Sequence, residues 1–114
     1  MNVARQGEVW FVDLDPTRGR EQAGRRPAVT ISVDQLGGGP SELAIMVPLT
    51  STDHGQRLHV PIDPPNGGVR QRSYAMPEMV RSVSRDRLVE RWGMLDDVTL
   101  VEIARRVRLL VRDP

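Results

Sequence analysis

The stretch between residues 13 and 27 gathers charged side chains around glycines. Its arginines are Arg18, Arg20, Arg25 and Arg26, and its glutamate is Glu21. A guanidinium presents a planar fork of N–H donors that matches the oxygens of a phosphate or a carboxylate. Gly24 lets the backbone approach a ligand, and Pro27 fixes the backbone beside Arg26. A solvated polar loop is the alternative, but the stretch is long for a hairpin connection. We therefore predict an anion or phosphate site here.

The residue types exclude several other kinds of site. All 16 basic residues are arginine, so the lysine of a P-loop or of a Schiff base is absent. There is no cysteine, which excludes disulfides, thiolate metal sites and a cysteine nucleophile. His54 and His59 have no partner at the spacing of metal ligands, and we predict that each is a lone surface histidine. Because the net charge is only +1, binding to nucleic acid requires a local basic patch.

Apolar and β-branched runs separated by turn residues predict six short strands. They cover residues 8–14, 27–33, 43–49, 58–62, 73–80 and 87–92, the last being a strand or the end of a one-turn helix. The third run is almost continuously apolar, which predicts burial on both faces. Pro27 is expected at the first position of its strand, and Pro77 interrupts the fifth run. Residues 51–57 form a polar loop.

The C-terminal segment has helical spacing. Val98, Val101, Ala104 and Val107, followed by residue 110 or 111, predict one buried helix face. Asp96 or Asp97 is suited to cap this helix, and Glu102 follows Thr99 at the spacing of a capping box. Several short strands followed by one helix predict an α+β fold with a small, strongly bent antiparallel sheet or open barrel.

The 114 residues are expected to form a single domain, 1–114. The longest apolar runs are only a few residues, whereas crossing a bilayer takes about 20. The first residues lack the apolar stretch of a secretory signal, so we expect a cytoplasmic protein with no membrane contact.

Three landmarks together resemble the MazF/PemK (Kid) family, the toxins of bacterial type II toxin–antitoxin pairs. The first is GEVWFVDLDPTRG at residues 7–19, continued by EQAG at 21–24 and by Arg26-Pro27. The second is VPLTS at residues 47–51. The third comprises EMVRSV at 78–83 and WGML at 92–95, before the terminal helix. The resemblance extends from about Gln6 to Leu110.

The resemblance implies a small SH3-like barrel of short, mostly antiparallel strands with a C-terminal helix, assembled as a homodimer. It implies a sequence-selective endoribonuclease that cuts single-stranded RNA without a metal or other cofactor. The products would be 2′,3′-cyclic phosphate and 5′-OH ends, and the cleavage would inhibit translation and growth. The resemblance also implies a protein partner, an acidic antitoxin.

By the same resemblance, Arg26 matches the family's catalytic arginine and Thr50 its catalytic threonine. Arg26 would stabilise charge on the phosphate, because arginine holds its proton too firmly to act as a good general base. Thr50 would bond a phosphate oxygen, although strand-end turn chemistry is its alternative role. Glu21 is the candidate base, with a salt bridge to a neighbouring arginine as its alternative. Further RNA contacts are expected from Arg18, Arg20, Arg25, Ser51, Thr52, Arg57 and Glu78.

The sequence departs from the family pattern at two places. Arg20 stands where some members carry a histidine, and Met76 and Glu78 stand where some carry arginine and aspartate. Glu78 is therefore a second candidate base. Trp10 and Tyr74 are able to stack bases, but aromatic residues in strands more often belong to the core. Two other functions stay open: a non-enzymatic toxin like CcdB, which binds DNA gyrase, and an RNA-binding barrel without catalysis.

Overall fold

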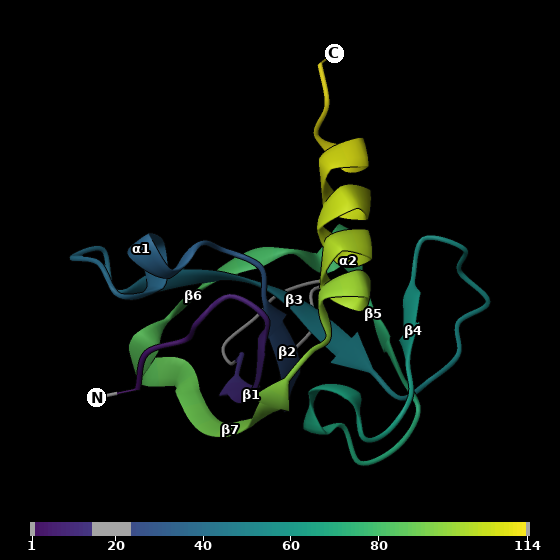
Figure 1. Cartoon of the computed structure of the whole chain (residues 1–114), viewed down its shortest axis with the longest axis horizontal. Coiled ribbons are helices and arrows are strands. Elements are labelled where there is room, and N and C mark those ends of the chain that lie inside the picture. The colour runs from purple at the N-terminus through teal and green to yellow at the C-terminus, as the bar shows by residue number, and fades with distance from the viewer. Residues whose placement is uncertain (1, 15–23, 114) are drawn as a thin grey trace.

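The computed structural model describes residues 2–14 and 24–113 (Figure 1). Its strands are β1 (Glu8–Asp13), β2 (Arg25–Thr30), β3 (Leu43–Thr50), β4 (Val60–Ile62), β5 (Ser73–Ala75), β6 (Arg81–Ser84) and β7 (Leu88–Met94). Its helices are α1 (Asp34–Gly37) and α2 (Asp97–Leu110), with short 3₁₀ turns η1 (Asn66–Gly68), η2 (Pro77–Met79) and η3 (Arg85–Arg87). Within the described ranges, no helix is long and apolar enough to cross a membrane.

The strands form one antiparallel sheet in the order β4-β5-β3-β2-β1-β7. Strand β3 is the longest and organises the sheet, because β6 pairs with its first half and β5 with its last two residues. Figure 1 shows the sheet curling on itself, with α2 in yellow standing at its centre and extending beyond it. The predicted α+β fold of short antiparallel strands with a C-terminal helix is confirmed.

Side-chain alternation along the strands fills two cores. Val9 of β1 joins a cluster that includes Ile103 of α2, whereas Trp10 and Val12 join a second cluster with Met46. Successive residues of a strand point to opposite faces, so a sheet covered on both sides needs apolar residues at every position. The first cluster consists of Val9, Val29, Val47, Leu49, Val60, Ile62, Val69, Ala75, Leu95 and Ile103. The second consists of Ala4, Trp10, Val12, Leu14, Ala28, Ala44, Met46, Val83 and Leu88.

The predicted burial of the third strand on both faces holds for only part of β3. Residues 46–49 are buried, but Leu43 is 37% exposed and Ile45 38% exposed. Ala44, between them, belongs to the second core cluster. The prediction is wrong for the first half of β3 because its outward side there takes no part in either core.

Several strand boundaries differ from the predicted ones. Strand β2 begins at Arg25 and ends at Thr30, so Pro27 lies within it, opposite Phe11. Proline is tolerated there because the pairing of β2 with β3 begins only at Ala28, and residue 27 pairs with β1 alone. This extension places Arg25 and Arg26 on a strand rather than in a loop.

The second half of the chain contains more elements than its apolar runs predict. Pro77 starts η2 and ends the fifth strand after residue 75, because proline cannot donate to a continuing ladder. Strand β6, which pairs with β3, begins after that run, at Arg81, where the sequence pattern predicted no strand. The last predicted strand is confirmed as β7, and the alternative one-turn helix also exists as η3 just before it.

Helix α2 buries a different face from the predicted one. Ile103 is fully buried, and Leu100 and Val107 pack beside it. Of the predicted buried face, Val107 is confirmed, but Val98 is 82% exposed and Val101 is 60% exposed, so the prediction is wrong for the start of the helix. The rotation of the helix is set at its first turn, where the Asn66 side chain donates hydrogen bonds to Asp96 and Thr99. This turns the Leu100–Ile103 side towards the core.

The caps of α2 also differ from the capping-box prediction. Asp96 is the N-cap, and its carboxylate accepts a hydrogen bond of 2.8 Å from the backbone N–H of Thr99. Glu102 takes no part in this cap. It accepts hydrogen bonds from Arg105 and Arg106 one turn further on, and these bonds lower the pKa of its carboxyl group to about 2.

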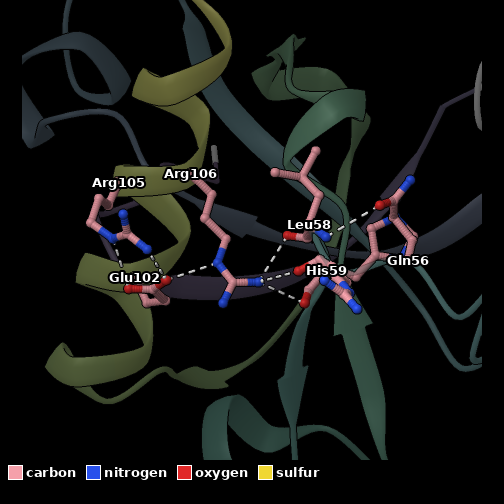
Figure 2. A network of polar contacts seen from close by, with 7 residues as sticks. Gln56, Leu58, His59, Glu102, Arg105 and Arg106 are labelled. Carbon is pink, nitrogen blue, oxygen red and sulfur yellow. Dashed lines mark hydrogen bonds and ion pairs between the residues drawn. The ribbon is translucent and has the colours of Figure 1, made fainter.

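Arg106 ties α2 to the segment that enters β4. One Nη of its guanidinium donates to the backbone carbonyl oxygens of Arg57, Leu58 and His59, at 3.0, 3.1 and 2.8 Å. Figure 2 shows the side chain crossing from the helix to this segment, while Glu102 receives its Nε–H at 2.8 Å. Hydrogen bonds from charged donors are among the stronger ones in proteins. Arg106 therefore fixes the end of the polar loop of residues 51–57.

We predict that Arg106→Leu lowers the free energy of unfolding by about 1–3 kcal/mol, because it removes charge-assisted bonds to three carbonyl groups. Arg105→Leu is the matched control, since Arg105 sits beside it and bonds only Glu102 among the described residues. The control should change stability by less than about 0.5 kcal/mol. Urea unfolding of both variants measures the difference, and equal losses would contradict the assigned role of Arg106.

Candidate functional site

A groove of about 490 Å³ opens on the face of the sheet where β1, β2 and β7 meet the end of β3. It is lined by Phe11, Arg25, Arg26, Pro27, Leu49, Thr50, Ser51, Thr52, Arg70, Gln71, Ser73 and Trp92. The structure therefore brings five of the residues singled out in the sequence to one place. Those five are Arg25, Arg26, Thr50, Ser51 and Thr52.

Arg26 is the partly buried cation of this groove. It lies on β2 opposite Val12, and its Nη1 donates a long hydrogen bond of 3.4 Å to the carbonyl oxygen of Leu49. Its Nε is buried and has no hydrogen-bond partner among the described residues. Burial lowers the pKa of the guanidinium below the ordinary value for arginine. A buried donor without a partner is costly, and an anion in the groove would satisfy it.

Thr50 ends β3 beside this guanidinium. Its Oγ1 accepts a hydrogen bond of 3.2 Å from the backbone N–H of Thr52, which holds the side chain in a short turn. Because Oγ1 accepts in this bond, the hydroxyl hydrogen stays available to donate to an oxygen of a ligand. Arg25 is exposed on the rim, with its Nε 3.9 Å from the Asp13 carboxylate. Arg26, Arg25 and Thr50 together offer two guanidinium groups and one hydroxyl to an anion in the groove.

The sequence analysis did not identify several residues that line the groove. Phe11, Arg70 and Trp92 line it, whereas Trp10 is buried in the second core cluster. A shift of one residue along β1 exchanges the two faces of the strand, and the sequence pattern alone did not decide which face met the groove. Tyr74 is half-buried, and its hydroxyl accepts a hydrogen bond from Arg72 outside the groove.

Two predicted RNA contacts lie outside the residues that line the groove. Glu78 is on η2, and its carboxylate lies 2.7 Å from Nε2 of His59. Arg57 is exposed in the loop before β4. The prediction of a surface histidine is wrong for His59, which is buried at 7% exposure because the segment just before β4 holds it against Glu78. The prediction is confirmed for His54, which is exposed.

The remaining candidates fall outside the described residues. These are Arg18, Arg20 and Glu21. Among the residues that the structure does describe, no group of three or more histidine, aspartate or glutamate side chains is placed to hold a metal ion.

Comparison with known proteins identifies the family. Residues 5–111 match the family model described as PemK-like, MazF-like toxin of type II toxin–antitoxin system. The chain is similar to the endoribonuclease EndoA of Bacillus subtilis, at 34% identity over 97 residues that cover 83% of each chain. It also resembles the crystal structure of MazF from Deinococcus radiodurans, with a TM-score of 0.85, 27% identity and coverage of 96% and 97%.

A crystal structure of MazE–MazF from the same organism matches with a TM-score of 0.78, 27% identity and coverage of 96% of each chain. The family model spans nearly the whole sequence, including the strands that build the groove. The chain belongs to the PemK-like, MazF-like toxins of type II toxin–antitoxin systems.

Proposed function

We propose that this chain is a sequence-selective endoribonuclease toxin that cuts single-stranded RNA in the groove. The observation that carries the proposal is the partly buried Arg26, whose Nε–H lacks a partner among the described residues, in the same groove as Thr50. A toxin that only bound gyrase would need no such pair, and EndoA, the similar Bacillus protein, is named an endoribonuclease. We place the activity in the cytoplasm, where bacterial RNA is translated.

The reaction begins with attack of a ribose 2′-OH on the adjacent phosphorus. The new O2′–P bond forms as the bond to the 5′ oxygen breaks, which leaves a 2′,3′-cyclic phosphate and a 5′-OH. Arg26 places its N–H fork on the non-bridging oxygens, where negative charge grows in the transition state. Thr50 donates its hydroxyl hydrogen to one of the same oxygens. Glu21 is the proposed base that accepts the 2′-OH proton, and the leaving 5′ oxygen takes a proton from solvent water to become the 5′-OH.

We predict that Arg26→Ala lowers the cleavage rate by a hundredfold or more, because a fixed donor to the transition state is worth roughly 10²–10³ in rate. Thr50→Ala acts in the same direction and more weakly. Arg26→Lys keeps the charge without the fork and should recover only part of the rate. The assay follows a long RNA in EDTA, with circular dichroism as the folding control. Cleavage within about threefold of wild type by folded Arg26→Ala would remove Arg26 from the mechanism.

The exposed apolar side of α2 supports a homodimer. Val98 and Val101 are 82% and 60% exposed in the first turns of the helix, and Leu109, three turns after Val98 on the same side, is 45% exposed. Apolar side chains gathered on one exposed surface mark a contact with another protein chain. We propose that a second copy of this chain covers this side of α2 and the neighbouring strands.

We predict a dimer mass by light scattering at micromolar concentration and a monomer for the double variant Val98→Asp, Val101→Asp. Two carboxylates buried in an apolar interface would be strongly unfavourable, whereas on an exposed helix surface they cost little. Circular dichroism should show that the variant stays folded. A monomeric wild type, or a variant that remains dimeric, would contradict the proposed interface.

An acidic antitoxin is the proposed protein partner. One of the similar solved structures is described as MazE–MazF. A groove that holds RNA phosphates with Arg25 and Arg26 will also attract the carboxylates of an extended acidic peptide. Such a segment, disordered when free, pays an ordering cost that its large contact surface must offset.

We predict that an acidic peptide from the cognate antitoxin displaces a non-cleavable RNA from the protein and inhibits cleavage. Added salt should weaken the binding of both ligands. The affinity for RNA should fall more than the affinity for the peptide, because apolar contacts also hold the peptide. Fluorescence anisotropy of labelled RNA measures the competition. Simultaneous binding of peptide and RNA with undiminished cleavage would show that the peptide does not use the RNA path.

A further inference from the structure

One wall of the groove is a stack of two aromatic rings and a guanidinium. The rings of Phe11 and Trp92 are nearly parallel, at 3°, with their centroids 5.5 Å apart. The Cζ atom of Arg70 lies 4.4 Å from the centroid of the Trp92 ring. All three side chains line the same groove as Arg26 and Thr50. Neither the proposed transition-state contacts nor the proposed base uses them.

A β-bulge brings Trp92 to this wall. In the pairing of β1 with β7, Val9 faces Gly93 and Trp10 faces Arg91, so Trp92 is the unpaired extra residue. Bulges turn a side chain away from the regular alternation of a strand and are frequent beside functional sites. Here the bulge places the indole beside Phe11, in line with the side of β1 that meets the groove.

A glycine contact brings Arg70 to the same wall. Gly68 has a φ of +74°, and a Cβ added to it would lie 2.2 Å from the carbonyl oxygen of Trp92. Only glycine allows the turn η1 to approach β7 so closely. The chain leaves this turn through Val69, which is buried, and Arg70 then lies over the indole.

The guanidinium of Arg70 is held loosely in this position. It pairs with Glu90 at 3.0 Å, and the two side chains are 70% and 58% exposed. An exposed ion pair of this kind contributes little to stability, so a ligand that covers the Arg70 guanidinium does so at small cost. The indole Nε1 of Trp92 is buried and has no hydrogen-bond partner among the described residues. The wall therefore presents flat groups that make few strong contacts within the protein. It lies next to Arg26, the arginine proposed to bind the phosphate.

We propose that Arg70 and Trp92 form a base-binding subsite, which stacks a nucleobase next to the phosphate held by Arg26. The inference rests on the proposed RNA-cleaving function. Unpaired bases stack on aromatic rings and on guanidinium planes, and each such contact contributes substantially to binding. In a duplex both faces of a base are covered by its neighbours, so this subsite accepts only single-stranded RNA. Arg70 is then a residue that selects the substrate rather than one that takes part in the reaction.

The chain provides a matched control. Arg72 is exposed like Arg70, pairs with Asp63 through its guanidinium and lies 5.6 Å from the Tyr74 ring. It carries the same charge only two positions away, but it does not line the groove. Arg70→Ala and Arg72→Ala therefore remove equal charge from exposed sites, and only the first removes a side chain from the subsite.

The experiment compares RNA with and without one base. The cut in a long RNA is mapped first, and a short RNA is made with a 2′-deoxy nucleotide that blocks cleavage at that cut. Further versions carry an abasic nucleotide on either side of it. Arg70→Ala should weaken binding of the intact RNA by about fivefold to a hundredfold, the range expected for one stacked base. The abasic RNA that lacks the stacked base should bind wild type and Arg70→Ala with the same affinity. Arg70→Lys should resemble Arg70→Ala, and Arg72→Ala should resemble wild type.

Each other outcome counts against the subsite. If Arg70→Ala weakens the intact and both abasic RNAs equally, or if Arg70→Lys restores binding, Arg70 contacts phosphate and the stacking assignment is wrong. If Arg70→Ala binds every RNA as wild type does while wild type still cleaves RNA, the subsite is wrong and the proposed function stands. If wild type fails to cleave any RNA, the proposed function itself fails.

A fluorescence measurement tests Trp92 without removing it. The chain has two tryptophans, so Trp10→Phe leaves Trp92 as the only one. Stacking of a base on the indole should quench its emission when intact RNA binds, and the abasic RNA identified above should quench it much less. Equal quenching by both RNAs would contradict a base on this ring.

Discussion

Strand β1 pairs with β2 on one side and with β7 on the other, and the groove exists only in the register that these pairings fix. In that register Val9 enters one core while Trp10 and Val12 enter the other. Phe11 then faces Pro27 across the β1–β2 pair and lines the groove. A shift of one residue would exchange the two faces of β1 and bury the wrong side chains. The stability of the two cores therefore determines where the functional side chains lie.

The groove combines cations that differ in how firmly the protein holds them. Arg26 is partly buried on a paired strand, with one long bond to Leu49 and a buried Nε–H free of described partners. Arg25 and Arg70 are exposed and meet carboxylates near the rim. A buried donor on a rigid strand is already oriented for a phosphate, so little reorganisation is needed during reaction. Exposed arginines on the rim instead attract the RNA by their charge, and their side chains adapt to its position.

Local signals in the sequence predicted most of the strands and the terminal helix, because most of the apolar runs end at an aspartate or a glycine. The family resemblance, and not these local signals, predicted that Arg26 and Thr50 belong to one site. They did not predict the aromatic wall, because it depends on a bulge at Trp92 and on the approach of Gly68 to β7, which are contacts between distant segments. The prediction of the buried face of α2 failed at the start of the helix for the same kind of reason. Its rotation is set by Asn66, which lies 30 residues before Asp96.

The proposed reaction in the groove is cleavage of RNA by attack of the 2′-OH on the adjacent phosphate. The most direct measurement is the chemistry of the new ends, determined by mass spectrometry of a short RNA and of the same RNA with one 2′-deoxy nucleotide at the cut. We expect a 2′,3′-cyclic phosphate and a 5′-OH from the first RNA and no cut at that position in the second. A cut in the deoxy substrate, or products ending in a 3′-OH and a 5′-phosphate, would contradict it.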